Sequence, residues 1–525
     1  MVFSLKTLYD NAILFLRRCL VQSDNAMPED HSGSSPLLSS YHDKSNDITT
    51  ETDSESSRSS LILEVMKEIR DLYNIAIPTI VTGLLTYGKS AISMHFLGKL
   101  GKEALAGGSL AIGMANITGY SIISGLASGM EGISSQACGA QQWILVGQTL
   151  QRTIVILILT SIPISILWLN FEPILLFFGQ NPTISSIATT YLAFSLPDLI
   201  FTALISPLKI FLRTQGVTLP LMYSAALALL LHAIINYVAF YTLGLGIQGV
   251  ALVGALTNLN LIIILFLYLC FSGVCSHSWH GWSYQCFKQW MPILSQGIPS
   301  CVSVCLEWWW YELLVLFSGL LPNATDTIAT YGIIIQATSL IYNFPHALSL
   351  AVSTKVGNEL GANRPSKAKS LSFTALLCAF VTAIVAMLFM VNMSHAWGRM
   401  FTEDEAILSL IATTLPIVGL CEIGNCPQTT ICGVLSGSAR PALGANINLV
   451  SFYVVGLPVA LFMGFLFDLG LFGLLLGLLS AQIVCAIVMV IVLARTDWQE
   501  QANRARELIV GISGAKEEHN EGIEA

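Results

Sequence analysis

The sequence predicts an all-α integral membrane protein with twelve transmembrane helices, arranged as two pseudo-symmetric six-helix bundles. Three observations predict this fold. The 525 residues are 54% hydrophobic and only 11% charged, whereas about 25% of the residues of an ordinary soluble domain are charged. From Leu72 onward, the chain contains successive apolar runs of about 18 to 25 residues, which is long enough to cross a bilayer as helices. The first and second halves of the chain also repeat each other.

The first 60 residues differ in composition from the rest of the chain. The stretch from Gln22 to Ser60 is rich in Ser, Asp and Glu and includes the run TTETDSESSRSS. Such a segment has too little apolar surface to offset the entropy of ordering the chain. We therefore expect residues 1–60 to form a disordered cytosolic tail. The net charge of −8 lies largely in the two tails and indicates no nucleic-acid partner.

The apolar runs define the expected elements in order. They are centred near residues 85, 118, 160, 198, 231, 260, 310, 340, 382, 420, 455 and 482. They predict a first lobe at 61–271, a cytosolic inter-lobe loop at 272–297, a second lobe at 298–495 and a cytosolic C-terminal tail at 496–525.

The basic residues predict the orientation, because Lys and Arg accumulate in short cytoplasmic loops. One set of alternate loops and helix ends holds only Lys99, Lys102 and Arg399. We therefore expect both termini in the cytosol and the protein in the plasma membrane or in an endomembrane such as the vacuole, the Golgi or the late endosome. The other set holds Lys67, Arg70, Arg152, Lys209, Arg213, Lys288, Lys355, Arg364, Lys367, Lys369, Arg440 and Arg495.

The internal repeat indicates the class of protein. Each half supplies six helices, an even number, so both halves enter the membrane in the same direction and a cleft is expected between them. This architecture is typical of secondary transporters, and the chain has neither a P-loop nor an HExxH or GxSxG enzyme motif. The repeat pairs Pro78 with Pro299, Gly139 with Gly361, Pro197 with Pro416, Pro220 with Pro441, and Gly249 with Gly473, at offsets of 221, 222, 219, 221 and 224.

Acidic residues in the predicted helices of the second lobe are the candidate functional groups. The run CLEWWWYE places Glu307 and Glu312 where the first lobe has Thr86 and Ala91, and a further helix holds Glu422. The region of the first lobe that corresponds to Glu422, PDLIFTALISP, is expected to place no acid at that depth. A carboxylate near the bilayer centre costs about 2.5 to 3.5 kcal/mol, so an unpaired one tends to bind a proton or to face a wet cavity.

Helix geometry assigns these residues different expected roles. Glu307 and Glu312 are about 140° apart on a helix, so only one of them is expected to face the cleft fully. Glu307 shares a face with Tyr311, and Glu312 shares one with Trp308 and Trp309, an arrangement that suits an organic cation. Packing of the Trp residues against lipid or other helices is the alternative. Lys89 is expected either to pair with one of these acids or to extend towards the surface.

The runs CLEWWWYE, VGNELGANRPSKAK and CEIGNCPQTTICGVLSGSARPALGANINLVSFYVVGLPVA resemble plant members of the multidrug and toxic compound extrusion (MATE) family. The resemblance covers about residues 65 to 495. It implies a V-shaped pair of bundles and proton-driven, or in some relatives sodium-driven, export of organic compounds. It also implies cation coupling and substrate contact at Glu307, Glu312 and Glu422. The chain reads SSQACGA where the family usually reads CGQAxGA.

These observations together predict a proton-coupled antiporter, not an enzyme, that exports organic cations, secondary metabolites or hormone-like small molecules. Glu307 and Glu422 are the expected coupling site, while Glu312, Trp308, Trp309, Tyr311 and Lys89 are expected to line the substrate cavity. We expect a monomer in the lipid bilayer with H+, or alternatively Na+, as the coupling ion and with no metal site or cofactor. Two alternatives are an exporter of organic anions such as carboxylates, and a signalling or trafficking component that acts through its tail.

Overall fold

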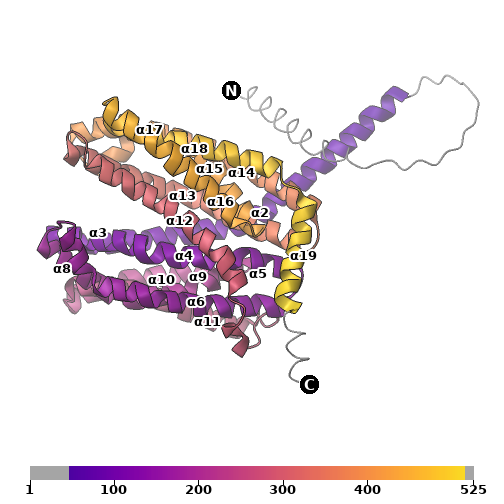
Figure 1. Ribbon diagram of the computed structural model, residues 1–525, viewed down its shortest axis with the longest axis horizontal. Helices are drawn as coiled ribbons and strands as arrows, with labels where there is room; N and C mark the ends of the chain where they lie inside the picture. Colours follow the sequence, from indigo (N-terminus) through magenta and orange to yellow (C-terminus); the bar gives the residue numbers. More distant parts are fainter. Residues whose placement is uncertain (1–45, 515–525) are drawn as a thin grey trace, which may run out of the picture.

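The computed structural model describes residues 46–514, and side chains from 62 to 513, as an assembly of helices (Figure 1). No strand occurs in this part of the chain. The helices of the first half are α2 (Asn46–Lys99), α3 (Lys102–Ala115), η1 (Asn116–Tyr120), α4 (Ser121–Ser128), α5 (Met130–Gly139), α6 (Trp143–Leu169), α7 (Phe171–Phe177), α8 (Pro182–Phe194), α9 (Leu196–Thr214), α10 (Leu219–Tyr237), η2 (Val238–Thr242) and α11 (Gly246–Ser272).

The second half repeats this pattern after a short linking segment that contains one turn of 3-10 helix. Its helices are η3 (Tyr284–Phe287), α12 (Met291–Ser318), α13 (Ala324–Gly361), α14 (Pro365–Arg399), α15 (Glu405–Gly437), α16 (Pro441–Asn448), η4 (Leu449–Gly456), α17 (Leu457–Leu461), η5 (Phe462–Leu466), α18 (Gly470–Ala494) and α19 (Trp498–Gly514).

The predicted all-α membrane fold is confirmed. Ten helices of the described part are long and apolar enough to span a membrane, and the bent pair α8 and α9, with a 47° bend, makes an eleventh. Helix α13, with 38 residues, is the remaining long helix. Polar side chains such as Gln336, Asn343 and His346 interrupt its apolar sequence. Each of the twelve expected centres lies in one of these segments.

Two hydrophobic cores correspond to two lobes. The N-lobe core is built mainly from α3 to α11 and includes Trp168 and Phe211, while the C-lobe core is built mainly from α12 to α18 and includes Trp310 and Phe452. Helix α2 crosses this division, because its Leu72 is buried in the C-lobe core whereas its Phe96 and Leu97 are buried in the N-lobe core. Helices α2 and α12 therefore connect the two lobes.

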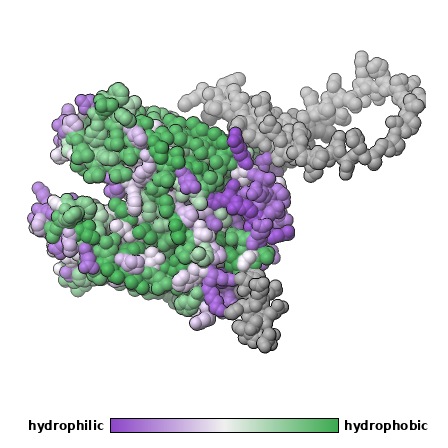
Figure 2. All heavy atoms as spheres, viewed as in Figure 1, coloured by the Kyte–Doolittle hydropathy of each residue, from purple (hydrophilic) through white to green (hydrophobic). Residues whose placement is uncertain are grey.

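The lobes diverge from one end of the molecule, here named the closed end, where α19 and the last turns of α5 and α13 lie (Figure 1). Figure 2 shows the apolar surface hollowed between the lobes at the opposite, open end. At the closed end the backbones touch, since a Cβ atom at Gly139 would overlap the carbonyl oxygen of Asn358, and one at Gly361 would overlap that of Gln136. These two glycines permit the close approach of α5 and α13.

Parts of both expected tails belong to helices of the described chain. Residues 1–45 lie outside the described part, and α2 begins at Asn46, within the segment 1–60 that was expected to form the N-terminal tail. Within the expected C-terminal tail, α19 is a packed helix. Its Trp498 and Ala502 lie in the C-lobe core and its Ile509 lies in the N-lobe core, so α19 bridges both lobes at the closed end.

Candidate functional site

Glu422 is a buried carboxylate in the middle of α15. Its side chain is 1% exposed, and its Oε2 accepts hydrogen bonds from Asn425 Nδ2 at 2.9 Å and from the Cys426 thiol at 3.5 Å. Neither partner is charged, and no Lys or Arg of the described chain forms an ion pair with Glu422. Its charge is therefore stabilised only by neutral dipoles.

Glu307 lies on α12 in the same lobe. Glu307 and Tyr342 of α13 line the same cavity of about 110 Å³, and the two side chains interact there. Glu307 and Glu422 both interact electrostatically with the phenol of Tyr311. The two carboxylates thus belong to one polar cluster in the C-lobe, and Glu307 also forms no ion pair within the described chain.

Neighbouring amides extend this cluster. Asn448 donates to Ser303 Oγ at 3.0 Å, and its oxygen accepts hydrogen bonds from Gln428 Nε2 and the Cys485 thiol, both at 3.3 Å. Asn448 directly precedes η4, a π-helical segment, and such segments occur frequently at functional sites. The C-lobe interior therefore contains hydroxyl, amide and carboxylate groups. Among the described residues, no Lys or Arg forms an ion pair with these carboxylates, Glu307 and Glu422.

The face of α12 that meets the N-lobe is different from the face that carries Glu307. Close backbone contacts join Gly297 and Cys301 to α4 and its end, and the Cys305 thiol lies 3.7 Å from Ser121 Oγ. Continued at helical spacing, this stripe reaches Trp308 and Glu312 towards the open end.

The aromatic residues of α12 also separate by face. Trp308 and Trp309 are 40% and 44% exposed, whereas Trp310 is fully buried and packs edge-on against Phe452 and Tyr453. Trp310 is therefore a core residue, whereas Trp308 and Trp309 are exposed at the surface of the helix. Glu307 lies about 140° around α12 from Glu312 and lines the cavity described above.

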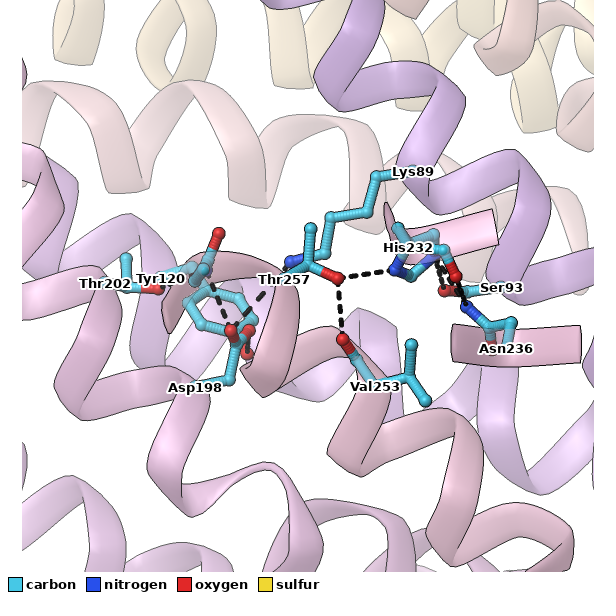
Figure 3. A network of polar contacts seen from close by, with 10 residues as sticks. Lys89, Ser93, Tyr120, Asp198, Thr202, His232, Asn236, Val253 and Thr257 are labelled. Atoms are coloured by element: carbon cyan, nitrogen blue, oxygen red, sulfur yellow. Dashed lines mark hydrogen bonds and ion pairs between the residues drawn. The ribbon is translucent and has the colours of Figure 1, made fainter. Parts of the chain in front are cut away.

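The N-lobe contains a second polar cluster, centred on Asp198 of α9 (Figure 3). Asp198 is 8% exposed. It accepts hydrogen bonds from the Tyr120 hydroxyl at 2.7 Å and from Asn258 Nδ2 at 2.8 Å. The Lys89 ammonium of α2 lies 3.9 Å from its Oδ1. Lys89 thus pairs with an acid of its own lobe, and not with Glu307, Glu312 or Glu422.

His232 extends this N-lobe cluster, as Figure 3 shows. Its Nδ1 is 2.6 Å from Thr257 Oγ1, and its Nε2 is 3.3 Å from Ser93 Oγ and 3.0 Å from Asn236 Nδ2. Every ring nitrogen of this fully buried histidine therefore has a partner, which is typical of a structural histidine.

The expectation that acids occur only in the second lobe is wrong. Asp198 belongs to the very segment, PDLIFTALISP, that was expected to place no acid at depth, and Glu131 of α5 is a further buried carboxylate, 5% exposed. An acidic residue inside an apolar run was the available signal in both cases. What distinguishes the lobes is pairing, because these two acids of the N-lobe have cationic partners.

Glu131 forms its ion pair with Arg213 of α9 and also contacts the other lobe. Its Oε1 binds the Arg213 guanidinium, while its Oε2 accepts a hydrogen bond from Ser353 Oγ of α13 at 3.1 Å. Gln136 Nε2 donates to the Gly437 carbonyl of α15 at 3.0 Å nearby. These contacts hold the lobes together at the closed end.

Comparisons with known proteins agree with this geometry. The MatE family model matches twice, at residues 78–238 and 299–462, so its two copies begin 221 residues apart, the offset of the internal repeat. The chain is 54% identical to Protein DETOXIFICATION 49 of Arabidopsis thaliana over 445 residues, which cover 85% of this chain and 89% of that protein. It is also 54% identical to Protein DETOXIFICATION 48 of Arabidopsis thaliana, over 85% of this chain and 84% of that protein.

Solved structures show the same architecture. The crystal structure of the eukaryotic MATE transporter AtDTX14 superposes with a TM-score of 0.81 at 31% identity, over 85% of this chain and 100% of that one. The MATE transporter VcmN of Vibrio cholerae, at 18% identity and a TM-score of 0.72 over 85% of this chain and 99% of that one, shares the fold. The protein therefore belongs to the multidrug and toxic compound extrusion (MATE) family of membrane transporters.

Proposed function

We propose that this MATE transporter exports small organic molecules by antiport with protons, and that Glu307 and Glu422 are the carboxylates that bind the transported protons. The observation that carries the proposal is a pair of carboxylates in one lobe, the buried Glu422 and the half-buried Glu307, which both interact with Tyr311 and have no basic partner among the described residues. A buried carboxylate without a cationic partner is neutralised when it takes up a proton.

The lobe arrangement supplies the alternating access that antiport needs. With the closed end facing the cytosol, the C-lobe acids are reached from the open, external or lumenal side, where protons are more concentrated. Rocking the lobes about α2 and α12 would then expose the same acids to the cytosol. The basic residues Arg364, Lys367 and Arg506 at the closed end support this orientation.

Organic cations are the first candidate substrates. Helical spacing continues the stripe of Gly297 and Cys301, which contact the N-lobe, to Trp308 and Glu312, and Tyr311 interacts with both coupling acids. An ammonium group bound there would combine charge pairing with cation–π attraction, which contributes about 0.5 to 2 kcal/mol. Displacement of a cationic substrate by protons couples the two fluxes, since both neutralise the same set of carboxylates.

Organic acids are a second candidate class, which Lys209 of the N-lobe favours. Lys209 is half-buried on α9 and lies near Lys89 and Arg213, two like charges. Arg213 pairs with Glu131 and Lys89 pairs with Asp198, and no carboxylate of the described chain pairs with Lys209. A carboxylate of the substrate would supply the missing counter-charge.

Transport by the purified protein in proteoliposomes tests the function and separates the substrate classes. The probes are radiolabelled tetraethylammonium and benzoate, with imposed pH or Na+ gradients. We expect the pH gradient to drive transport, and Glu307→Gln and Glu422→Gln to abolish that drive, while Glu103→Gln, an exposed carboxylate of α3, retains it. Transport indifferent to the pH gradient would contradict proton antiport.

The two substrate classes differ in their response to Lys209→Gln. For an organic-acid transporter, this change lowers benzoate transport about tenfold or more, because it removes the free energy that one charge-assisted hydrogen bond contributes to substrate binding. For an organic-cation transporter, tetraethylammonium transport persists in Lys209→Gln and falls in Glu312→Gln.

A further inference from the structure

The cavity that contains Glu307 continues to the closed end. It is lined by Glu307 and Tyr342 of the C-lobe and also by Ser128 and Glu131 of the N-lobe. Its volume of about 110 Å³ has room for several water molecules, each of which needs about 10 to 15 Å³ on this scale. The cavity therefore joins the proposed coupling acid to the contact between the lobes.

One face of α13 follows this cavity with polar side chains. Tyr342, His346, Ser349 and Ser353 are spaced by four, three and four residues, so they form one stripe along about 16 Å of helix. The His346 ring stacks on the Tyr342 ring at 5.4 Å, and the imidazole lines the cavity. The stripe begins at Tyr342, which lines the cavity together with Glu307.

The stripe ends at the contact that holds the lobes together. Ser353 donates to Glu131 Oε2 at 3.1 Å across the lobe junction, and Glu131 Oε1 binds Arg213. Both carboxylate oxygens of Glu131 are therefore occupied, one within the N-lobe and one from the C-lobe. A charge change at Glu131 acts directly on this junction.

We propose that Glu131 is a further protonation site of the transport cycle, reached from Glu307 through the cavity along the Tyr342–His346 stripe, and that its protonation unlocks the closed end. The proposal rests on the proton antiport proposed above. In this step the O–H bond of the Glu307 carboxyl breaks and an O–H bond forms at Glu131. The tyrosine hydroxyl, the imidazole and cavity water each accept one proton and release another.

The result of this transfer is a weaker junction. A protonated Glu131 no longer neutralises Arg213, and its O–H meets a donor group, that of Arg213 or of Ser353, where the carboxylate oxygen had accepted a hydrogen bond. A buried ion pair that loses the charge of one partner leaves the other charge uncompensated, which is strongly unfavourable. The closed arrangement, in which Arg213 is buried, therefore loses stability relative to an open arrangement in which water solvates Arg213 and Glu131. The proton then leaves on the side that opens.

The charges around Glu131 set its response. Helices α4, α6, α9, α12, α13, α15 and α19 pack against α5. Arg152 of α6 is turned away from it to Gln289 of the inter-lobe segment, and Glu359 of α13 pairs with Arg364 and Lys367. The other helices that pack against α5 also carry charged or titratable groups. These are Arg213 and Lys209 of α9, His346 and Lys355 of α13, Glu307 of α12, Glu422 of α15 and Arg506 of α19.

Hydrogen–deuterium exchange of the full chain in lipid nanodiscs tests the lock without substrate or gradient. The readout is the exchange of peptides from residues 130–142 and 353–364, corrected for the intrinsic pH dependence. We expect more opening at pH 5.5 than at pH 7.5 in the wild type. Glu131→Gln should show the high exchange at both pH values, and Glu131→Asp, which keeps the charge, should stay closed at pH 7.5.

The proposed proton route from Glu307 to Glu131 is tested by the rate at which the closed end opens after a change of pH. After a jump from pH 7.5 to 5.5, exchange at the closed end should rise at least tenfold more slowly in His346→Phe than in the wild type, and Glu103→Gln should match the wild type. Closed-end exchange that is equal at both pH values, or unchanged by Glu131→Gln, would overturn the lock. A normal rise in His346→Phe would overturn the route. Failure of proton antiport itself appears separately, as efflux indifferent to pH in proteoliposomes.

Discussion

Replacing Gly361 by alanine should open the closed end of the transporter. The added Cβ would overlap the carbonyl oxygen of Gln136 across the lobe junction. This obstacle is backbone and cannot rotate away, so α5 and α13 must separate. Such overpacking costs about 1 to 3 kcal/mol, and the cost falls on the closed arrangement alone, because separated lobes leave the methyl group in solvent.

The expected shift is therefore about 5- to 150-fold towards an arrangement that is open at this end. Hydrogen exchange of residues 130–142 measures it, since exchange reports the free energy of local opening. Gly332→Ala is the matched control: it lies on the same helix, and a Cβ atom added there would meet nothing within 4 Å, so closed-end exchange should not change. Equal exchange in Gly361→Ala and the wild type would refute the close packing of the lobes.

Three further predictions concern other parts of the fold. Trp310→Ala should lower stability by about 3 to 5 kcal/mol because it empties a fully buried site, while Trp308→Ala should leave the melting temperature nearly unchanged. Asp198→Asn should lower the melting temperature because it leaves Lys89 without its acid, and adding Lys89→Gln should recover part of the loss in a double-mutant cycle. Ile509→Asp should detach α19 from the N-lobe core, which exchange of residues 498–513 would show; unchanged protection there would contradict the bridging role.

Much of the architecture was predictable because the bilayer restricts the choices. Apolar runs of spanning length must be helices, and the repeat offset of about 221 residues fixes how the two sets correspond. Glu307 and Glu422 stood out for the same reason, since an acid inside an apolar run has few structural explanations. The V-shaped family fold then followed from the resemblance.

The pairing of charges could not be predicted in the same way. Asp198 follows a proline near a bend in the chain, and only the packing of the helices brings Lys89 of α2 to it. Lys209 and Arg213 were counted as cytosolic basic residues, yet Arg213 is 7% exposed and paired with Glu131. One sequence does not reveal which helices are neighbours, so it does not reveal these partners.

Helix α19 was missed for a different reason. Its buried residues Trp498, Ala502, Ala505, Ile509 and Ile512 recur at spacings of four, three, four and three, which is the pattern of an amphipathic helix. Its many charges lower the mean hydropathy, so a search for apolar spans passes over it. The helical period was readable, but the surface that it covers, both lobes at once, exists only in the folded protein.

The central claim is that Glu307 and Glu422 bind the protons that drive transport. The most direct measurement is the proton flux itself, followed with a pH-sensitive dye enclosed in proteoliposomes when a transported probe is added outside. The account predicts a substrate-dependent proton flux in the wild type that is lost in Glu307→Gln and in Glu422→Gln but kept in Glu103→Gln. A flux of normal size in the Glu307→Gln, Glu422→Gln double variant would contradict it.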